Sequence, residues 1–154
     1  MTIEIRAARE DDWPGLLEIE QSRYGQSGYS PYFLRMVPLV FGATCLVADD
    51  DGLLVGYSLG APESGRPERA WILSLAVRPA AGRQGIGTKL ANACIEALCG
   101  RGAVEVQLTV APDNEVAVRL YESLGFAVER TDAGFFGPGT ERLLMRLPAP
   151  NRAS

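Results

Sequence analysis

The chain has 154 residues, 47% of them hydrophobic, which is enough for one globular domain with a substantial core. Its formal net charge of −4 argues against a nucleic-acid-binding surface, where lysine and arginine would cluster. Histidine is absent, and this excludes Ser-His-Asp triads, Cys-His nucleophile pairs and the usual zinc sites. We expect residues 1–148 to form a single domain, residues 149–154 to form a loose tail, and no metal to bind.

Cysteine usage indicates the compartment. Cys45, Cys94 and Cys99 are odd in number and lie in apolar runs, so we expect small, buried, reduced thiols. The sequence shows no signal peptide and no apolar run long enough to span a bilayer. Together these features predict a cytoplasmic protein with no nucleic-acid or membrane partner.

The first half of the chain predicts a strand at residues 3–7, followed by a helix. Asp11 or Asp12 can cap this helix, and Pro14 fits its first turn. Its inward-facing apolar residues are Leu16, Leu17 and Ile19. The next elements are a helix that begins at Ser30-Pro31 and runs to about residue 41, hairpin strands at 44–48 and 53–61, a polar loop at 62–67 and a buried strand at 70–77. We interpret the acidic run at 49–52 as a solvated hairpin turn and not as a metal site.

The second half alternates helices and strands. A helix follows residue 85 and is stopped by the sequence at 100–102. Its predicted core positions are Ile86, Leu90, Ala93, Cys94, Ala97 and Leu98. Then come a strand at 104–110, a helix at 113–123 that Gly125 ends, and strands at 127–131 and 142–147. This order predicts a mixed sheet between helical layers.

Glycines cluster where the strand at 70–77 passes into the next helix. The junction consists of Gly82, Arg83, Gln84, Gly85, Ile86, Gly87 and Thr88. Glycines at such a junction let the backbone approach a ligand, and the free amides and helix dipole favour a phosphate group. The junction therefore predicts a phosphate-bearing cofactor, although a tight connection without a ligand would use similar residues.

Two nucleotide-binding motifs do not fit this junction. A P-loop needs lysine before serine or threonine, whereas Thr88 precedes Lys89 here. A dinucleotide-binding turn needs a third glycine at the position of Leu90. Both alternatives therefore fail at residues that the binding mechanism requires.

A second motif follows the strand at 106–110. Asn114 and Tyr121 lie about two turns apart on one helix face, roughly 10 Å along the axis, with the small Ala117 between them. Val116, Leu120 and Leu124 form a separate stripe that we expect to face the core. By themselves, Asn114 fits a helix cap and Tyr121 a half-buried packing residue.

The two motifs, in this order and at this spacing, resemble those of the GNAT superfamily, the acyl-CoA-dependent N-acyltransferases. The resemblance implies an α/β (α+β) fold with α/β/α layers. Its mixed, mostly antiparallel central sheet would splay between the strands at 73–77 and 106–110. A fully paired core strand at 73–77 is the alternative that periodicity leaves open.

The resemblance also implies acetyl-CoA as the cofactor and an acetyltransferase activity. The implied cofactor-binding residues are Leu75, Ala76, Val77, Arg83, Gln84, Gly85, Ile86, Gly87, Thr88, Asn114, Ala117 and Tyr121. Gly82 stands where the family usually has arginine or glutamine, so Arg83 would supply the positive charge. Tyr121 would approach the thioester sulfur and act as the general acid for the leaving thiolate.

The acceptor is expected to be a primary amine of a small molecule or a protein. Aromatic residues in the regions that border the family's acceptor pocket are Tyr24, Tyr29, Tyr32, Phe33, Phe135 and Phe136, for each of which core packing is an equal alternative. The C-terminal half is similar to ribosomal-protein alanine N-acetyltransferases, which carry a glutamate where Thr109 stands. No base is therefore evident in the sequence, and a base acting through water or an already neutral amine would fit.

Two other functions stay open. A CoA-binding sensor without catalysis would keep the glycine junction and could lack the glutamate. A structural interaction protein with the same fold would have no use for the glycines. The sequence does not fix the oligomeric state and is compatible with a homodimer.

Overall fold

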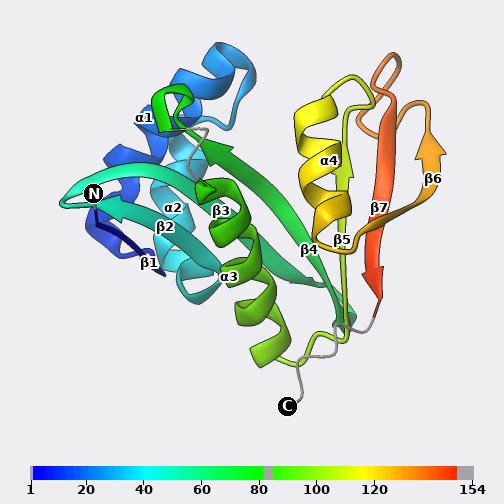
Figure 1. The fold of residues 1–154 in the computed structure, drawn as a ribbon, viewed down its shortest axis with the longest axis horizontal. Coiled ribbons are helices and arrows are strands. Elements are labelled where there is room, and N and C mark those ends of the chain that lie inside the picture. Colours follow the sequence, from blue (N-terminus) through cyan, green and yellow to red (C-terminus); the bar gives the residue numbers. More distant parts are fainter. Residues whose placement is uncertain (1, 82–84, 149–154) are drawn as a thin grey trace.

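A computed structural model describes residues 2–81 and 85–148, whose strands form one seven-stranded sheet in the order β1-β2-β3-β4-β5-β7-β6 (Figure 1). The strands are β1 (Ile3–Ala7), β2 (Cys45–Asp50), β3 (Leu53–Glu63), β4 (Arg66–Val77), β5 (Glu105–Val110), β6 (Ala127–Asp132) and β7 (Arg142–Pro148). Neighbouring strands are antiparallel except β4 and β5, which are parallel. This confirms the expected mixed, mostly antiparallel sheet. Gly82, Arg83, Gln84 and the expected loose tail at 149–154 lie outside the described residues.

Helices cover both faces of the sheet, as expected for α/β/α layers (Figure 1). They are α1 (Trp13–Tyr24), α2 (Pro31–Phe41), α3 (Ile86–Gly100) and α4 (Glu115–Ser123), with short 3-10 turns at Glu10–Asp12, Gly25–Ser27, Gly42–Thr44 and Pro79–Ala81. One hydrophobic core lies under α3 and α4, and a second lies under α1 and α2. Apolar residues of β2, β3 and β4 alternate between these two cores, which fixes the register of the sheet.

The starts of two helices follow from their sequence. The Ser30 hydroxyl accepts a hydrogen bond from the Phe33 N–H at 3.2 Å, and Pro31 occupies the first turn of α2. The Asn114 side chain accepts from the Ala117 N–H at 3.2 Å and begins α4 in the same way.

The sequence predicted that Asp11 or Asp12 caps α1, but the Asp12 side chain makes no capping hydrogen bond. Its carboxylate accepts a hydrogen bond from the Arg9 N–H at 2.7 Å and forms an ion pair with Arg6 at 2.8 Å. Asp12 therefore ties β1 to the start of α1. The arginine satisfies this carboxylate in place of the helix amides.

The polar segment at 62–67 is not a loop, contrary to expectation. β3 continues to Glu63 and β4 begins at Arg66, with Pro62 opposite Ala70 and Glu63 opposite Arg66. The register shifts after Pro62, so this proline lies at an irregularity of the ladder, where prolines are tolerated. The polar composition reflects the exposed end of a hairpin and not the absence of pairing.

The core-facing residues of two helices differ in part from those that the sequence predicts. In α3 the buried positions are Ile86, Leu90, Ala91, Cys94, Ile95 and Leu98, and Ala93 and Ala97 lie at the margin. In α4 the predicted core residue Val116 is 76% exposed. Tyr121 occupies the core position instead, with Ala117, Val118 and Leu124 beside it, because the large aromatic ring packs edge-on against Phe126.

Cys45 and Cys94 are buried, as expected, and burial raises the pKa of each thiol to about 12. In residues 2–81 and 85–148, no helix has both the length and the apolar character needed to cross a membrane.

Candidate active site

β4 and β5 pair over a short stretch and then separate. Their parallel ladder joins Arg69 to Trp71 with Glu105 to Gln107, and beyond it each strand pairs with its other neighbour alone. A register shift on β4, which leaves Leu73 without a partner on β3, accompanies the divergence. The expected splay is thus present, and a fully paired β4 is excluded.

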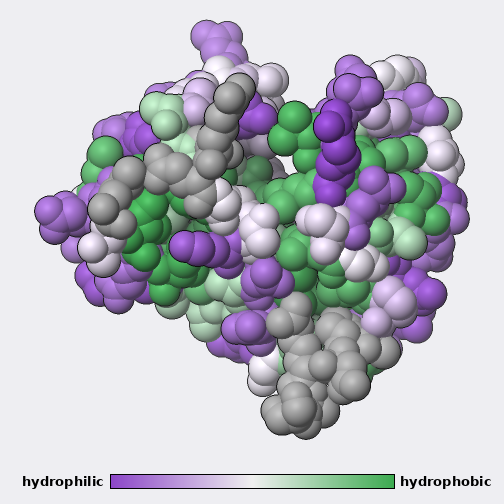
Figure 2. Space-filling model, viewed as in Figure 1, coloured by the Kyte–Doolittle hydropathy of each residue, from purple (hydrophilic) through white to green (hydrophobic). Residues whose placement is uncertain are grey.

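The space between the separated strands is a cleft of about 830 Å³. Its walls include Leu73, Leu75, Leu108 and Val110 from the two strands, and Ala117 from α4. Figure 2 shows the molecule hollowed at this place, with hydrophobic side chains around the opening. A cleft with apolar side chains on both strands and backbone polar groups along them can hold an extended chain.

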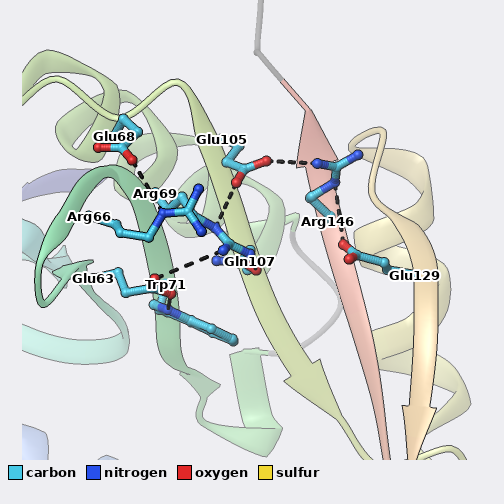
Figure 3. A network of polar contacts seen from close by, with 9 residues as sticks. All are labelled: Glu63, Arg66, Glu68, Arg69, Trp71, Glu105, Gln107, Glu129 and Arg146. Atoms are coloured by element: carbon cyan, nitrogen blue, oxygen red, sulfur yellow. Dashed lines mark hydrogen bonds and ion pairs between the residues drawn. The ribbon is translucent and has the colours of Figure 1, made fainter.

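A polar network crosses the strands where they still pair (Figure 3). Arg69 of β4 lies 2.7 Å from the Glu105 carboxylate of β5 and donates to the Gln107 side chain at 2.6 Å. The other oxygen of Glu105 accepts from Arg146 of β7 at 2.8 Å. The Trp71 indole N–H donates to Glu63 at 2.8 Å. These bonds connect β4, β5 and β7 at the closed end of the cleft.

α4 places Asn114, Ala117 and Tyr121 along one wall of the cleft, as the helical spacing predicts. The Asn114 side-chain oxygen is occupied by its capping bond, which leaves its NH₂ group for a ligand. Tyr121 is 7% exposed, and its hydroxyl has no hydrogen-bond partner among the described residues. Burial raises the pKa of Tyr121, so its hydroxyl keeps its proton throughout the neutral range.

The N-terminus of α3 lies beside the end of β4 (Figure 1). Gly85 precedes the helix with a φ of +71°, a left-handed conformation that favours glycine. A Cβ atom at Gly87 would lie 3.5 Å from Leu120, which brings this turn close to α4. The first-turn amides of α3 have no acceptor within the helix and are available to an anion.

A buried carboxylate, Glu20 of α1, also lines the cleft and was missed from the sequence. It accepts hydrogen bonds from the Tyr57 hydroxyl and from the Tyr29 N–H, the latter at 2.8 Å. Ser74 of β4 donates to the Tyr57 oxygen at 3.2 Å. Burial, followed by the hydrogen bond to Glu20, raises the pKa of Tyr57. Glu20 follows the apolar residues Leu16 and Ile19 on α1, and that inward position is the signal that could have identified it.

Two tyrosines donate hydrogen bonds to carbonyls of β4 beyond the end of its ladder with β5. The Tyr29 hydroxyl donates to the Leu73 carbonyl at 3.1 Å, and the Tyr24 hydroxyl donates to the Leu75 carbonyl at 3.4 Å. Both side chains line the cleft, as do Phe135 and Phe136. Of the other predicted acceptor-side aromatics, Tyr32 is 87% exposed, and Phe33 packs against Tyr29 in a tilted arrangement with ring centroids 4.7 Å apart.

Thr109 contacts Arg142 at the start of β7, a residue that was not among the predicted site residues. The Arg142 guanidinium donates to the Thr109 hydroxyl at 3.2 Å and to the Thr109 carbonyl at 3.1 Å. It also lies over the Phe136 ring, 5.3 Å from the centroid. No group of three or more acidic or cysteine side chains among the described residues could hold a metal ion.

Comparison with known proteins agrees with this architecture. Residues 4–126 match the family model described as Acetyltransferase (GNAT) family. The chain belongs to this family. An N-alpha-acetyltransferase of Sulfurisphaera tokodaii is 30% identical over 94% of this chain and 92% of the relative.

Solved GNAT structures share the fold. The ribosomal-protein-S18-alanine N-acetyltransferase from Escherichia coli superposes with a TM-score of 0.79 at 23% identity, covering 96% of this chain and 94% of that one. Diaminobutyrate acetyltransferase EctA from Paenibacillus lautus, in complex with its substrate and coenzyme A, gives a TM-score of 0.82 at 21% identity and covers 99% of each chain. The family predicted from the two sequence motifs is thus confirmed.

The GNAT fold brings part of the predicted site together. Leu75, Asn114, Ala117 and Tyr121 line one cleft, whereas Ala76 and Val77 lie farther along β4, outside the lining. Gly85, Ile86, Gly87 and Thr88 form the turn and the start of α3. Arg83 and Gln84 lie outside the described residues. The part that each of these residues plays in cofactor binding stays a prediction.

Proposed function

We propose that this chain transfers the acetyl group of acetyl-CoA to a primary amine in the cleft between β4 and β5. The observation that carries the proposal is the splay of these strands beside a buried tyrosine, Tyr121, whose hydroxyl has no hydrogen-bond partner among the described residues. The N-alpha-acetyltransferase relative and the GNAT neighbour with bound coenzyme A support the same chemistry.

The residues present fit acetyl-CoA. The first-turn amides of α3, with Arg83, Gln84 and Thr88, would hold the diphosphate. The apolar slot and the backbone of residues 75–77 would hold the pantetheine arm, with Asn114 donating from its free NH₂ group. Bound acetyl-CoA supplies a thioester whose C–S bond breaks as the amine nitrogen forms the new C–N bond.

Two protons must move in this reaction. The Tyr121 hydroxyl, protonated because burial raises its pKa, donates toward the departing thiolate. The attacking amine loses a proton, and Glu20 is the acceptor that the structure favours, directly or through water. Its carboxylate is buried and lines the cleft, and each oxygen keeps a lone pair beyond its protein hydrogen bond. The products are an N-acetyl amine and free CoA thiol.

Calorimetric titration with acetyl-CoA and thiol release with a panel of amines test the proposal. Gly87→Ala is the better probe of the diphosphate turn, because its Cβ would have ordinary contacts, whereas any side chain at Gly85 is strained by the positive φ. We expect Gly87→Ala to weaken acetyl-CoA binding and to leave the melting temperature nearly unchanged, because the added methyl group blocks close approach of the phosphate. The control is Gly100→Ala, at an open position at the end of α3.

Unchanged affinity in Gly87→Ala would overturn the assignment of the diphosphate site. Binding of acetyl-CoA without release of free thiol in the presence of any amine would favour the alternative of a CoA sensor. A preference for ATP or NAD over acetyl-CoA would overturn both.

We also propose that residues 1–148 act as a single acetyltransferase domain in the cytoplasm, which the buried thiols of Cys45 and Cys94 support. Whether two copies associate is a question for sedimentation of the full chain.

A further inference from the structure

Arg142 has a place in the cleft that acetyl transfer by itself does not require. Its two hydrogen bonds to Thr109 fix the direction of the guanidinium, whose central carbon lies over the Phe136 ring. These bonds use the Nε–H and one N–H of Nη2. An arginine has five N–H donors, so the two on Nη1 and the second on Nη2 are without a partner in the part of the chain that is described.

No carboxylate neutralises this guanidinium within the described residues, where every ion pair involves other side chains. Besides Thr109, its hydrogen-bond partner, the tyrosines Tyr24, Tyr29 and Tyr121 line the same cleft. Burial lowers the pKa of Arg142, yet an arginine stays charged at neutral pH. A half-buried cation without a counter-ion favours binding of an anion.

The two other charged residues in the described lining of the cleft do not act as counter-ions of Arg142. Glu20 is bound by Tyr57 and Tyr29, and Asp113 is exposed before the start of α4. Arg142 is therefore a lone cation in the described lining of a cleft, in a chain whose net charge is −4.

The surroundings of Arg142 place it on the side of the acceptor. Tyr24 and Tyr29 come from the end of α1 and its connection to α2, and Phe136 comes from the segment between β6 and β7. The helix α3, whose N-terminus is the proposed diphosphate site, belongs to the opposite helical layer (Figure 1). Tyr121, the proposed donor to the thiolate, lines the same cleft as Arg142.

We propose, on the basis of the acetyl transfer proposed above, that the acceptor amine carries a carboxylate and that the free N–H groups of Arg142 bind it. Because Arg142 and Tyr121 line the same cleft, one acceptor can place its carboxylate at Arg142 and its amine beside the thioester. An amino acid has this chemistry, and so does a peptide whose first residue is Asp or Glu. A planar guanidinium suits a carboxylate, which it can bind through two parallel hydrogen bonds.

Matched pairs of acceptors test this inference and separate its two sources. The first pair is L-lysine and cadaverine, which differ by the carboxylate alone. The second pair is the amidated peptides Glu-Ala-Ala-Tyr and Gln-Ala-Ala-Tyr. We expect kcat/KM for thiol release to be about 10- to 100-fold higher for the acid member of at least one pair. A preference in the first pair points to a free amino acid, and one in the second points to a peptide.

Substitutions assign any preference to Arg142. Arg142→Gln should remove it, Arg142→Lys should retain part of it, and Arg142→Glu should invert it toward cadaverine or the Gln peptide. Inversion is the decisive result, because a variant with damaged structure would lose activity toward both acceptors of a pair to the same extent. Arg130→Gln, which removes an exposed arginine from the neighbouring strand β6, is the control and should behave like the parent.

Equal rates within both pairs, or a preference that survives in Arg142→Gln and Arg142→Glu, would overturn the inference and leave the acetyl transfer standing. Weaker acetyl-CoA binding in Arg142→Gln, with the acid preference intact, would also overturn it, because Arg142 would then serve the cofactor. No thiol release with any amine would overturn the proposed function and this inference with it.

Discussion

Tyr121 is a buried residue with a raised pKa, and its hydroxyl has no hydrogen-bond partner in the part of the chain that is described, so a single substitution can test what it does. Tyr121→Phe keeps the ring and its edge-on contact with Phe126. We expect acetyl-CoA affinity and melting temperature to change little. The chemical step should slow by about 10²- to 10⁴-fold, because the leaving thiolate loses its proton donor. Single-turnover thiol release measures this step.

Phe126→Leu is a matched control, since it disturbs the same packing and leaves the hydroxyl in place. If Tyr121→Phe stays within a factor of about two of the parent while chemistry limits the rate, Tyr121 is a packing residue. The thiolate would then leave unaided or with a proton from water.

Glu20 gives a second prediction at the scale of one residue. Glu20→Gln should lower the rate by about 10²- to 10⁴-fold, because the amide cannot accept a proton from the amine. Higher pH should restore part of the loss, since more of the acceptor amine is then already neutral. Glu18→Gln, on the same helix but exposed, should leave rate and pH profile unchanged.

A purely structural Glu20 would behave differently. The Gln variant would then melt at a lower temperature, and raising the pH would not recover its rate. A pH–rate profile of the variant, recorded beside its melting curve, separates these two outcomes.

At the scale of the element, the cleft depends on β4 and β5 being joined at one end and apart at the other. Glu105 makes the joint by contacting Arg69 and Arg146 at once. Glu105→Gln should lower the free energy of unfolding by about 1–3 kcal/mol, because Arg69 and Arg146 each lose a charged partner and keep only the longer contacts with Glu63, at 4.0 Å, and Glu129, at 3.4 Å. Urea unfolding followed by circular dichroism measures this loss.

Glu68→Gln is the control for this prediction. Glu68 also pairs with an arginine, Arg66, but both side chains are about half exposed, so the loss should stay below about 1 kcal/mol. Equal losses of unfolding free energy in Glu105→Gln and Glu68→Gln would contradict a special role of Glu105 in holding β4 to β5.

The elements could be predicted from the sequence where local signals decide them. Ser30-Pro31 marked the start of α2, and the motif at Asn114 marked the start of α4. Local signals failed where tertiary packing decides. Val116 fits an apolar stripe, but the ring of Tyr121 takes the core position. Glu20 and Arg142 were missed because their role arises from contacts with Tyr57 and Thr109, which are far away in the sequence.

At the scale of the whole molecule, the two sequence motifs predicted the layers, the splay and the family, since each motif connects a strand to a helix at the cleft. The acceptor side could not be predicted in the same way. It is assembled from α1, the connection to α2, β3 and the β6–β7 segment, which meet only after the sheet has formed. Its chemistry depends on their contacts and not on the spacing of residues within any one of them.

Acid sensitivity gives a prediction for the whole molecule, because Asp12 joins β1, β2 and α1. Burial by itself would raise the pKa of Asp12, but hydrogen bonds from Arg6 and the Arg9 N–H outweigh it and lower this pKa below its ordinary value. Arg6 also binds Asp49 of β2 at 3.1 Å. A carboxyl whose folded pKa is lowered stabilises the fold above its unfolded pKa of about 3.9. This contribution is lost as the pH falls through the folded pKa.

We therefore expect Asp12→Asn to lower the free energy of unfolding at pH 7 by about 1.5–3 kcal/mol, the range for hydrogen bonds to charged groups. The difference from the parent should shrink as the pH falls below about 4, because the parent then also loses the charge. Urea unfolding at a series of pH values between about 3 and 7 measures the difference. Asp11→Asn, at the exposed neighbouring position, should stay within about 0.5 kcal/mol of the parent at each pH. A constant difference for Asp12→Asn across the series would show that the amide disturbs packing, and that the charge of Asp12 does not hold β1 to α1.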